Sequence, residues 1–202
     1  MAGVLSVLTC CASTTGVAQA GPATGESRAS TTVVINEVST DGPNGQLDEF
    51  VEIRNISSEP QDLRGLTLRL HQQNCGTTDS IPIPSGIVLA PKGSPGQFLV
   101  MMGPNFSGVI VDDTNVAPYF ARGQGLASPA GAVSLRSGIG TPVDAVAWAP
   151  SPLGANCRME GPPARFPVGM PGAAMSRDYP SNDTDSNFSD FHIHLRTAGE
   201  SI

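Results

Sequence analysis

The chain has few charged residues and no basic run. Of its 202 residues, 14% are Asp, Glu, Lys or Arg, and the formal net charge is −7. The eleven Lys and Arg residues are scattered, so no segment indicates a groove that follows nucleic acid phosphates. The acidic residues are also spread out, which indicates solubility rather than a docking signal. Composition therefore argues against a nucleic acid partner.

Helical and membrane-spanning patterns are missing as well. No window repeats apolar residues at i, i+3, i+4 and i+7 over three turns, and no apolar stretch after residue 20 is as long as a membrane span. Glycine and proline are abundant instead, with 23 and 18 residues. Because these residues favour turns, we expect a single all-β domain that is large enough to bury its own core.

The sequence lacks the motifs that position a catalytic nucleophile, a metal or a phosphate. It contains no G-x-S-x-G, H-E-x-x-H or Walker motif and no G-x-G-x-x-G after a strand, and none of its three histidines is in a motif with a nucleophile. A nucleophile, a base and an orienting group cannot be nominated from spacing. We therefore predict a non-enzymatic protein without a cofactor.

Residues 1–20 are predicted to be a signal peptide. They are mostly small and apolar, and they end in Ala18-Gln19-Ala20, a small-x-small cleavage pattern, although no Lys or Arg precedes the apolar stretch. A disordered N-terminus is the alternative. Residues 21–30 are predicted to be a flexible linker. The expected location of the mature protein is therefore extracellular, with no membrane span.

The four cysteines form two groups. Cys10 and Cys11 lie in the predicted signal peptide and would be lost with it, although acylation of one of them in a lipoprotein is a weaker alternative. Cys75 and Cys157 remain as an even pair, which predicts a disulfide in an oxidising compartment. Two unrelated buried thiols are the alternative interpretation.

Residues 33–70 contain three short runs that are typical of strands. VVINEV, EFVEIRN and LRGLTLRL are separated by turn-forming segments. The period of two in the middle run places Val51 and Ile53 on the core face. The same register predicts that Glu52 and Arg54 face solvent in a cross-strand charge ladder.

Later segments continue this pattern. Residues 98–102 (FLVMM) are typical of a strand buried on both faces, and residues 109–111 are expected to form a short strand. Residues 133–136 and 143–148 are expected to form a hairpin, preceded by a loop over residues 115–129.

Short strands with frequent turns favour an antiparallel β-sandwich, here expected over residues 31–150. Prolines are frequent after residue 149 and disfavour regular elements. We therefore expect residues 151–202 to be a Pro-rich, mostly irregular C-terminal extension packed on the sandwich.

Several segments stand in an order that matches a known family. They are Ile35-Asn36-Glu37-Val38, Glu49 to Asn55, the group Leu63, Gly65 and Leu68, Ile87 to Gly93, Gly131 to Arg136, and Val143 to Trp148. In this order the chain resembles the lamin-tail domain, the immunoglobulin-like module of nuclear lamins that also occurs in secreted bacterial proteins. The resemblance covers roughly residues 26 to 150. It implies an immunoglobulin-like sandwich, a bacterial source and a role in interaction. Ser176-Arg177 and residues 183–191 resemble the extension that follows in bacterial members.

The sharpest polar cluster is Asp183, Asp185, Asn187 and Asp190. Alternating carboxylate and amide oxygens can surround Ca²⁺, but Phe188 stands where an EF-hand loop needs glycine, and no bidentate Glu follows. Asp and Asn side chains also bond nearby backbone N–H groups in tight turns. We favour the turn, with calcium as the alternative, and assign no metal site.

His192 and His194 flank Ile193, so on a strand both imidazoles would point to one face. This spacing can serve Zn²⁺ or Cu²⁺, but no third ligand is apparent, and exposed strand histidines are the favoured interpretation.

Acidic and aromatic residues offer weaker candidates. Carboxylates around the first hairpin could form a glycosidase pair, but the two glutamates point to opposite faces of a strand. Tyr119-Phe120, next to Arg122, forms either a binding tip or a loop that folds back on the sandwich. Trp148 is expected to cap the core. The carboxylates considered as a glycosidase pair around the first hairpin are Asp41, Asp48, Glu49 and Glu52.

These observations favour a secreted, non-enzymatic binding or structural module that acts outside the cell or at its surface. Its partner would be an unknown protein or a component of the cell envelope. One alternative is an accessory of extracellular nucleases or phosphoesterases, because lamin-tail modules are also fused to such enzymes. A calcium-dependent, adhesion-like module is the other alternative.

Overall fold

The computed structural model describes residues 29–111, 113–119, 125–200 and 202. The predicted signal peptide, nearly all of the predicted linker, Cys10, Cys11, Phe120 and Arg122 lie outside the described residues.

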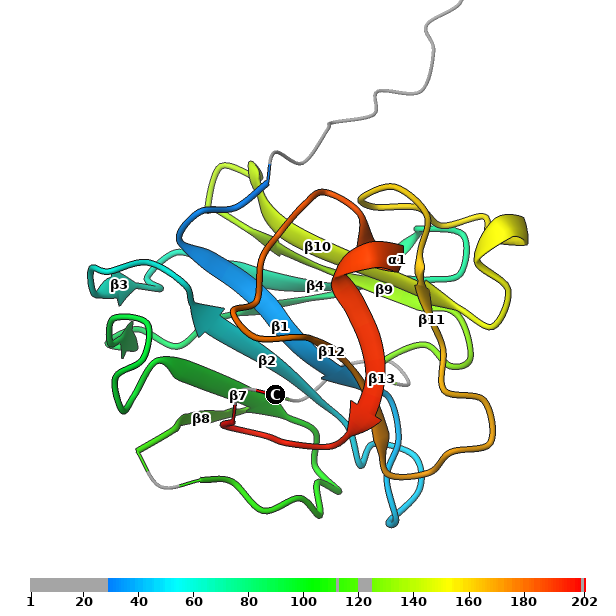
Figure 1. Ribbon diagram of the computed structural model, residues 1–202, viewed down its shortest axis with the longest axis horizontal. Coiled ribbons are helices and arrows are strands. Elements are labelled where there is room, and N and C mark those ends of the chain that lie inside the picture. The colour runs from blue at the N-terminus through cyan, green and yellow to red at the C-terminus, as the bar shows by residue number, and fades with distance from the viewer. Residues whose placement is uncertain (1–28, 112, 120–124, 201) are drawn as a thin grey trace, which may run out of the picture.

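Two large sheets pack face to face in a sandwich (Figure 1). The six-stranded sheet has the order β13-β12-β1-β2-β7-β8, and the five-stranded sheet has the order β11-β10-β9-β4-β5. Neighbouring strands are antiparallel except for the edge pairs β7–β8 and β10–β11, which are parallel. The bounds are β1 (Val33–Ser39), β2 (Phe50–Asn55), β3 (Gln61–Asp62), β4 (Thr67–Gln72), β5 (Thr77–Pro82), β6 (Val88–Leu89), β7 (Phe98–Met102), β8 (Asn115–Pro118), β9 (Gly131–Arg136), β10 (Pro142–Ala149), β11 (Ala164–Arg165), β12 (Ala173–Arg177) and β13 (Phe191–Leu195), with the short helices η1 (Pro152–Gly154) and α1 (Asn187–Asp190), while β3 and β6 form a small separate pair.

The core lies between the sheets and follows from the alternation of apolar residues. Val51 and Ile53 of β2 are fully buried in it, as predicted. The hairpin β9–β10 and the buried strand at residues 98–102 are also confirmed. Trp148 lies in the core near the end of β10, and its indole Nε1–H donates to the Ala127 carbonyl at 3.0 Å. This bond satisfies the one polar atom of the largest buried side chain.

The prediction that Glu52 and Arg54 face solvent is wrong. Both side chains point away from the core, as the register requires, but they are 0% and 1% exposed. The C-terminal segment covers this outer face, and the Gly199 N–H donates to Glu52 Oε2. Arg54 donates from Nη1 to Ser181 Oγ at 2.6 Å. A charge ladder is also absent at this point, because the residue opposite Glu52 is Glu37.

The C-terminal extension is more regular than its prolines suggest. β12 pairs with β1, and β13 pairs with β12, so the extension supplies two of the six strands of one sheet (Figure 1). The prolines at 150, 152, 162, 163, 167 and 171 all precede β12 and leave both strands uninterrupted. The segment after β13 then crosses the outer face, where Ala198 packs against Phe50 and Val100.

A disulfide joins the extension to the five-stranded sheet. Cys75, in the β4–β5 turn, is bonded to Cys157, and their Cα atoms are 4.9 Å apart. This pairing confirms the prediction from cysteine count. No helix among the described residues is long and apolar enough to cross a membrane.

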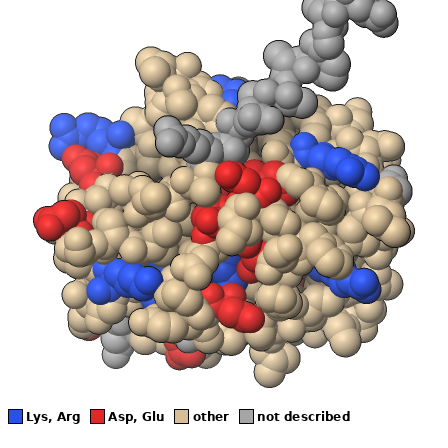
Figure 2. Space-filling view, turned by 45° about the horizontal axis from the view of Figure 1, so that its top comes forward, with Lys and Arg blue, Asp and Glu red and all other residues tan. Residues whose placement is uncertain are grey.

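One strand prediction and one loop prediction are wrong. Residues 109–111 form no strand, and Val109 is 87% exposed. Residues 115–118 form β8 rather than a loop, because they pair with β7 in parallel. On the face shown in Figure 2, Lys and Arg side chains lie apart, as their scattered positions in the sequence predict, whereas several acidic side chains gather near the centre, which the sequence did not predict.

Candidate functional site

The four residues of the candidate calcium cluster, Asp183, Asp185, Asn187 and Asp190, do not converge on one point. Asp183 Oδ2 accepts the Ser30 N–H at 2.6 Å, and Asp185 Oδ2 accepts the Ala29 N–H at 2.9 Å. Asn187 turns toward β10, where its amide bonds the backbone of Ala147 and Ala145. These contacts fix the chain where it enters β1 and hold α1 against β10. The preference for a turn over a calcium site stays a prediction.

Arg177 occupies the centre of the remaining acidic groups. Its guanidinium donates to Asp144 Oδ1 at 3.1 Å and to Asp190 Oδ2 at 2.9 Å, and it lies 3.5 Å from Asp183 Oδ1. Its Nε also donates to the Ile35 carbonyl. The side chains of Arg177, Asp144 and Asp183 are 0% exposed.

Burial sets the protonation of this cluster. It raises the pKa of Asp144 to about 6, against the attraction of Arg177. Burial also opposes the charge of Arg177, but the carboxylates of Asp144, Asp183 and Asp190 raise the pKa of the guanidinium. Arg177 therefore provides the positive charge that these carboxylates share, and the cluster ties β12 to β10 and to the β12–β13 connection. Sequence reasoning missed this role, because a lone Arg in a strand carries no signal.

The suspected glycosidase carboxylates are structural as well. Glu49 Oε1 accepts the Tyr119 hydroxyl at 2.7 Å, and its Oε2 accepts the Leu126 N–H at 2.9 Å. Tyr119 is 2% exposed, so it folds back on the sandwich instead of forming a binding tip. Asp48 is bonded by Ser107 and Arg196. Burial alone would raise the pKa of Asp48, but hydrogen bonds from Ser107 and Arg196 outweigh burial and lower this pKa to about 2.

We expect Tyr119→Phe to lower the free energy of unfolding by about 2 kcal/mol, because it removes a donor from the buried carboxylate of Glu49. Urea unfolding followed by Trp148 fluorescence measures this. Tyr179→Phe is the matched control, because Tyr179 is 62% exposed. Equal changes in the free energy of unfolding for the two substitutions would show that the hydrogen bond from Tyr119 to Glu49 does not stabilise the fold.

Several buried acids have raised pKa values, and we therefore expect the free energy of unfolding to fall as the pH rises. Burial raises the pKa of Glu37, of Glu49 and, most strongly, of Glu52, where the charge of Glu37 adds to the effect. A group whose pKa is raised by folding stabilises the fold below its unfolded pKa, and this contribution is lost as the pH rises through the folded pKa. His71 opposes the trend up to about pH 6.5, because burial lowers its pKa to about 4.

Urea unfolding at about pH 5 and about pH 8 should therefore give a lower free energy of unfolding at the higher pH. Glu52→Gln should flatten this dependence, because it removes the most strongly shifted acid and its repulsion with Glu37. Stability that increases between these two pH values, or a Glu52→Gln variant with the slope of the wild type, would contradict this assignment.

His192 and His194 lie on β13 and point to the same side, as predicted. The structure also supplies a neighbour that the sequence did not reveal. Asp178, which follows β12 directly, lies 3.3 Å from His192 Nδ1 and 2.9 Å from His194 Nε2.

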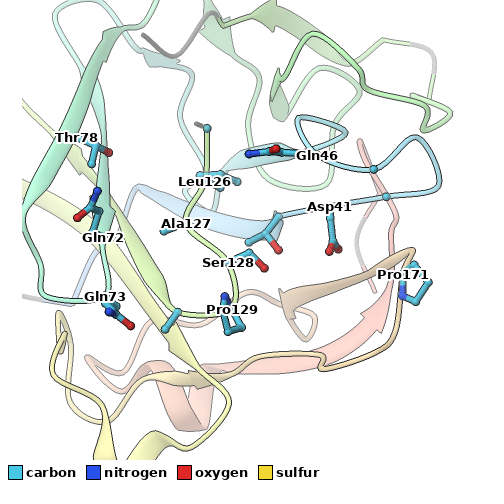
Figure 3. A pocket seen from close by; sticks show the side chains of 15 residues that line it. Asp41, Gln46, Gln72, Gln73, Thr78, Leu126, Ala127, Ser128, Pro129 and Pro171 are labelled. Atoms are coloured by element: carbon cyan, nitrogen blue, oxygen red, sulfur yellow. The ribbon is translucent and has the colours of Figure 1, made fainter. Parts of the chain in front are cut away.

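An open groove with a volume of about 900 Å³ lies at one end of the sandwich (Figure 3). Four separate segments form it: the β1–β2 connection, the β4–β5 hairpin, residues 125–130 and Pro171. The side chains of Gln72, Gln73 and Thr78 are exposed, and Ser128 and Asp41 lie on the opposite side in Figure 3. Among the described lining residues, Asp41 is the single ionisable one. The groove can therefore offer hydrogen bonds to an uncharged ligand.

Comparison with known proteins agrees with this architecture. A family profile described as Lamin Tail Domain matches residues 26–149, which is more than half of the chain. The chain belongs to the lamin tail domain family. This family consists of non-catalytic, immunoglobulin-like domains, so the predicted fold class is confirmed. A search of curated proteins finds no match.

The lamin tail domain match ends at the last residue of β10. β12 and β13 lie beyond the match, yet they complete the six-stranded sheet. The segment that covers Glu52 also lies beyond the match. Arg177 and the Asp178–His192–His194 group also lie beyond the match. The groove, in contrast, is formed by residues inside the match apart from Pro171.

Proposed function

We propose that this lamin tail domain is an exported, non-enzymatic binding module that attaches to a neutral glycan of the cell envelope through the groove. The observation that carries the proposal is the lining of the groove. Exposed side-chain amides and hydroxyls converge there from both sheets, with a single carboxylate and no cation among the described lining residues. Hydroxyl-rich polymers bind through such groups, whereas phosphate-bearing partners need Lys or Arg.

A binding role is supported by how the buried carboxylates are used. Glu49, Asp48 and Asp144 each accept bonds that anchor a loop or a strand. A catalytic acid needs a free oxygen within reach of a substrate, and these groups are buried among their structural partners. A calcium-dependent mode has less support, because Arg177 already neutralises the acidic cluster.

Export is supported by the disulfide and by the cleavage pattern at Ala18-Gln19-Ala20. Disulfides persist in oxidising compartments, which include the bacterial periplasm and the extracellular space. The net charge of −7 also disfavours binding to nucleic acid or to an anionic membrane.

The proposal can be tested by co-sedimentation with protein-free envelope polysaccharide of the source organism. Mature protein beginning at Gly21 should pellet with the polysaccharide in buffer that contains EDTA. The double variant Gln72→Ala/Gln73→Ala should bind at least roughly tenfold more weakly, a difference of about 1.4 kcal/mol. Gln61→Ala, on β3 outside the groove, is the matched control and should bind like the wild type. Failure of the wild type to pellet, or equal binding by the double variant, would refute the proposal.

A further inference from the structure

Three side chains at the edge of the six-stranded sheet converge on one point. β13 is the edge strand of this sheet, and His192 and His194 stand two residues apart on it. They pair with Ser176 and Ala174 of β12, so all four residues share one face. Asp178 lies two residues beyond Ser176 on the same side, within diagonal reach of His192.

Each histidine faces a different oxygen of the same carboxylate. His194 Nε2 lies 2.9 Å from Asp178 Oδ1, and His192 Nδ1 lies 3.3 Å from Asp178 Oδ2. The two rings are 6.4 Å apart between centroids and meet at 78°, so they do not stack on one another. One ligand atom from each residue can be chosen such that all three lie within 4.8 Å of one another.

These spacings fit a small cation. Zinc bonds of about 2.0–2.1 Å to nitrogen and oxygen in a tetrahedron place neighbouring ligand atoms roughly 3.3 Å apart. Two imidazoles and one carboxylate are also ligand types that Zn²⁺ and Cu²⁺ accept. Three protein ligands leave a fourth position open to water or to a group from another molecule.

Stability does not account for this arrangement. The side chains of Asp178, His192 and His194 are 57%, 53% and 28% exposed. Exposed ion pairs contribute little to folding, because water screens them and the side chains lose conformational freedom. The Arg177 cluster, which also gathers three acids, differs because a guanidinium already fills its centre.

We propose that Asp178, His192 and His194 form a surface site for a divalent transition-metal cation of the Zn²⁺ class. The metal joins the end of β12 to β13, and thus closes the connection that carries α1. The site is independent of the groove and of the proposed glycan ligand.

Metal titration of the untagged, disulfide-bonded protein after EDTA treatment tests this proposal. Isothermal titration with ZnCl₂ should show one saturable equivalent. Asp178→Asn should weaken binding at least roughly tenfold, and His192→Gln/His194→Gln should abolish it. Glu59→Gln, which removes an exposed carboxylate far along the chain, should bind like the wild type.

A second readout identifies the ligands even if a variant folds poorly. In NMR spectra of the wild type, Zn²⁺ should shift the imidazole signals of His192 and His194. His71 is the internal control, because it is buried and bonded to Ser134 and Thr77. No saturable binding up to about 1 mM Zn²⁺, undiminished binding by the variants, or unshifted His192 and His194 signals would overturn the proposal.

Discussion

Replacing Arg177 by Met is expected to lower the free energy of unfolding by about 3–5 kcal/mol, a large fraction of the stability of a domain of this size. The substitution removes the only guanidinium that contacts Asp144, Asp183 and Asp190 among the described residues. It leaves buried carboxylates without a counter-charge, and burial of an unpaired charge is far more costly than burial of the pair. Urea unfolding at neutral pH measures the loss.

Arg64→Met provides the matched control. Arg64 also pairs with an aspartate, Asp62, at 3.0 Å, but its side chain is 74% exposed. We expect this variant to lose less than about 1 kcal/mol. The double variant Arg177→Met/Asp144→Asn should regain part of the stability lost by Arg177→Met, because it removes one uncompensated carboxylate. Similar losses for Arg177→Met and Arg64→Met would show that the buried cluster does not hold the C-terminal extension in place.

Cys157→Ser is expected to destabilise the protein by about 4.5 kcal/mol on the chain-entropy model of disulfides, less any strain that the bond imposes on the folded state. The expectation rests on the separation of 82 residues between Cys75 and Cys157, which closes a long loop in the unfolded chain. The far-UV spectrum should change little, because Cys157 lies in a segment with few regular elements.

Cys75→Ser tests the same bond from its other end. Both variants should melt at the same lowered temperature, and the wild type under reducing conditions should melt there too. Melting of either variant at the temperature of the oxidised wild type would mean that the bond adds no stability.

Much of the sandwich could be predicted because its strands alternate. The positions of Val51 and Ile53 follow from a period of two, and the hairpin β9–β10 follows from a short turn between apolar runs. The disulfide follows from counting cysteines. Each of these features depends on residues that are close in sequence or on a simple count.

The errors concern what covers a strand. Alternation places Glu52 and Arg54 on the outer face, but it cannot reveal that residues after β13 bury that face. Proline counting in the extension likewise missed β12 and β13, because all of its prolines lie outside these two strands. β12 pairs with an edge that β1 provides, more than a hundred residues earlier in the chain, and β13 then pairs with β12.

The candidate sites were hidden for a similar reason. The spacing of His192 and His194 was visible in the sequence, but their neighbour Asp178 is brought close only by the β12–β13 pairing. The groove draws its lining from four separate segments, and its glutamines resemble ordinary surface residues. A sequence pattern alone contains neither arrangement.

The proposed role of the groove is tested most directly by NMR mapping of the envelope polysaccharide on the protein. A soluble fragment of the polysaccharide is titrated into ¹⁵N-labelled mature protein, with EDTA present. The proposed function predicts that shifts concentrate at the groove, including Asp41, Gln72, Gln73, Thr78 and Ser128. Shifts confined to the β12–β13 hairpin, shifts spread over the surface, or unchanged spectra at saturating polysaccharide would contradict it.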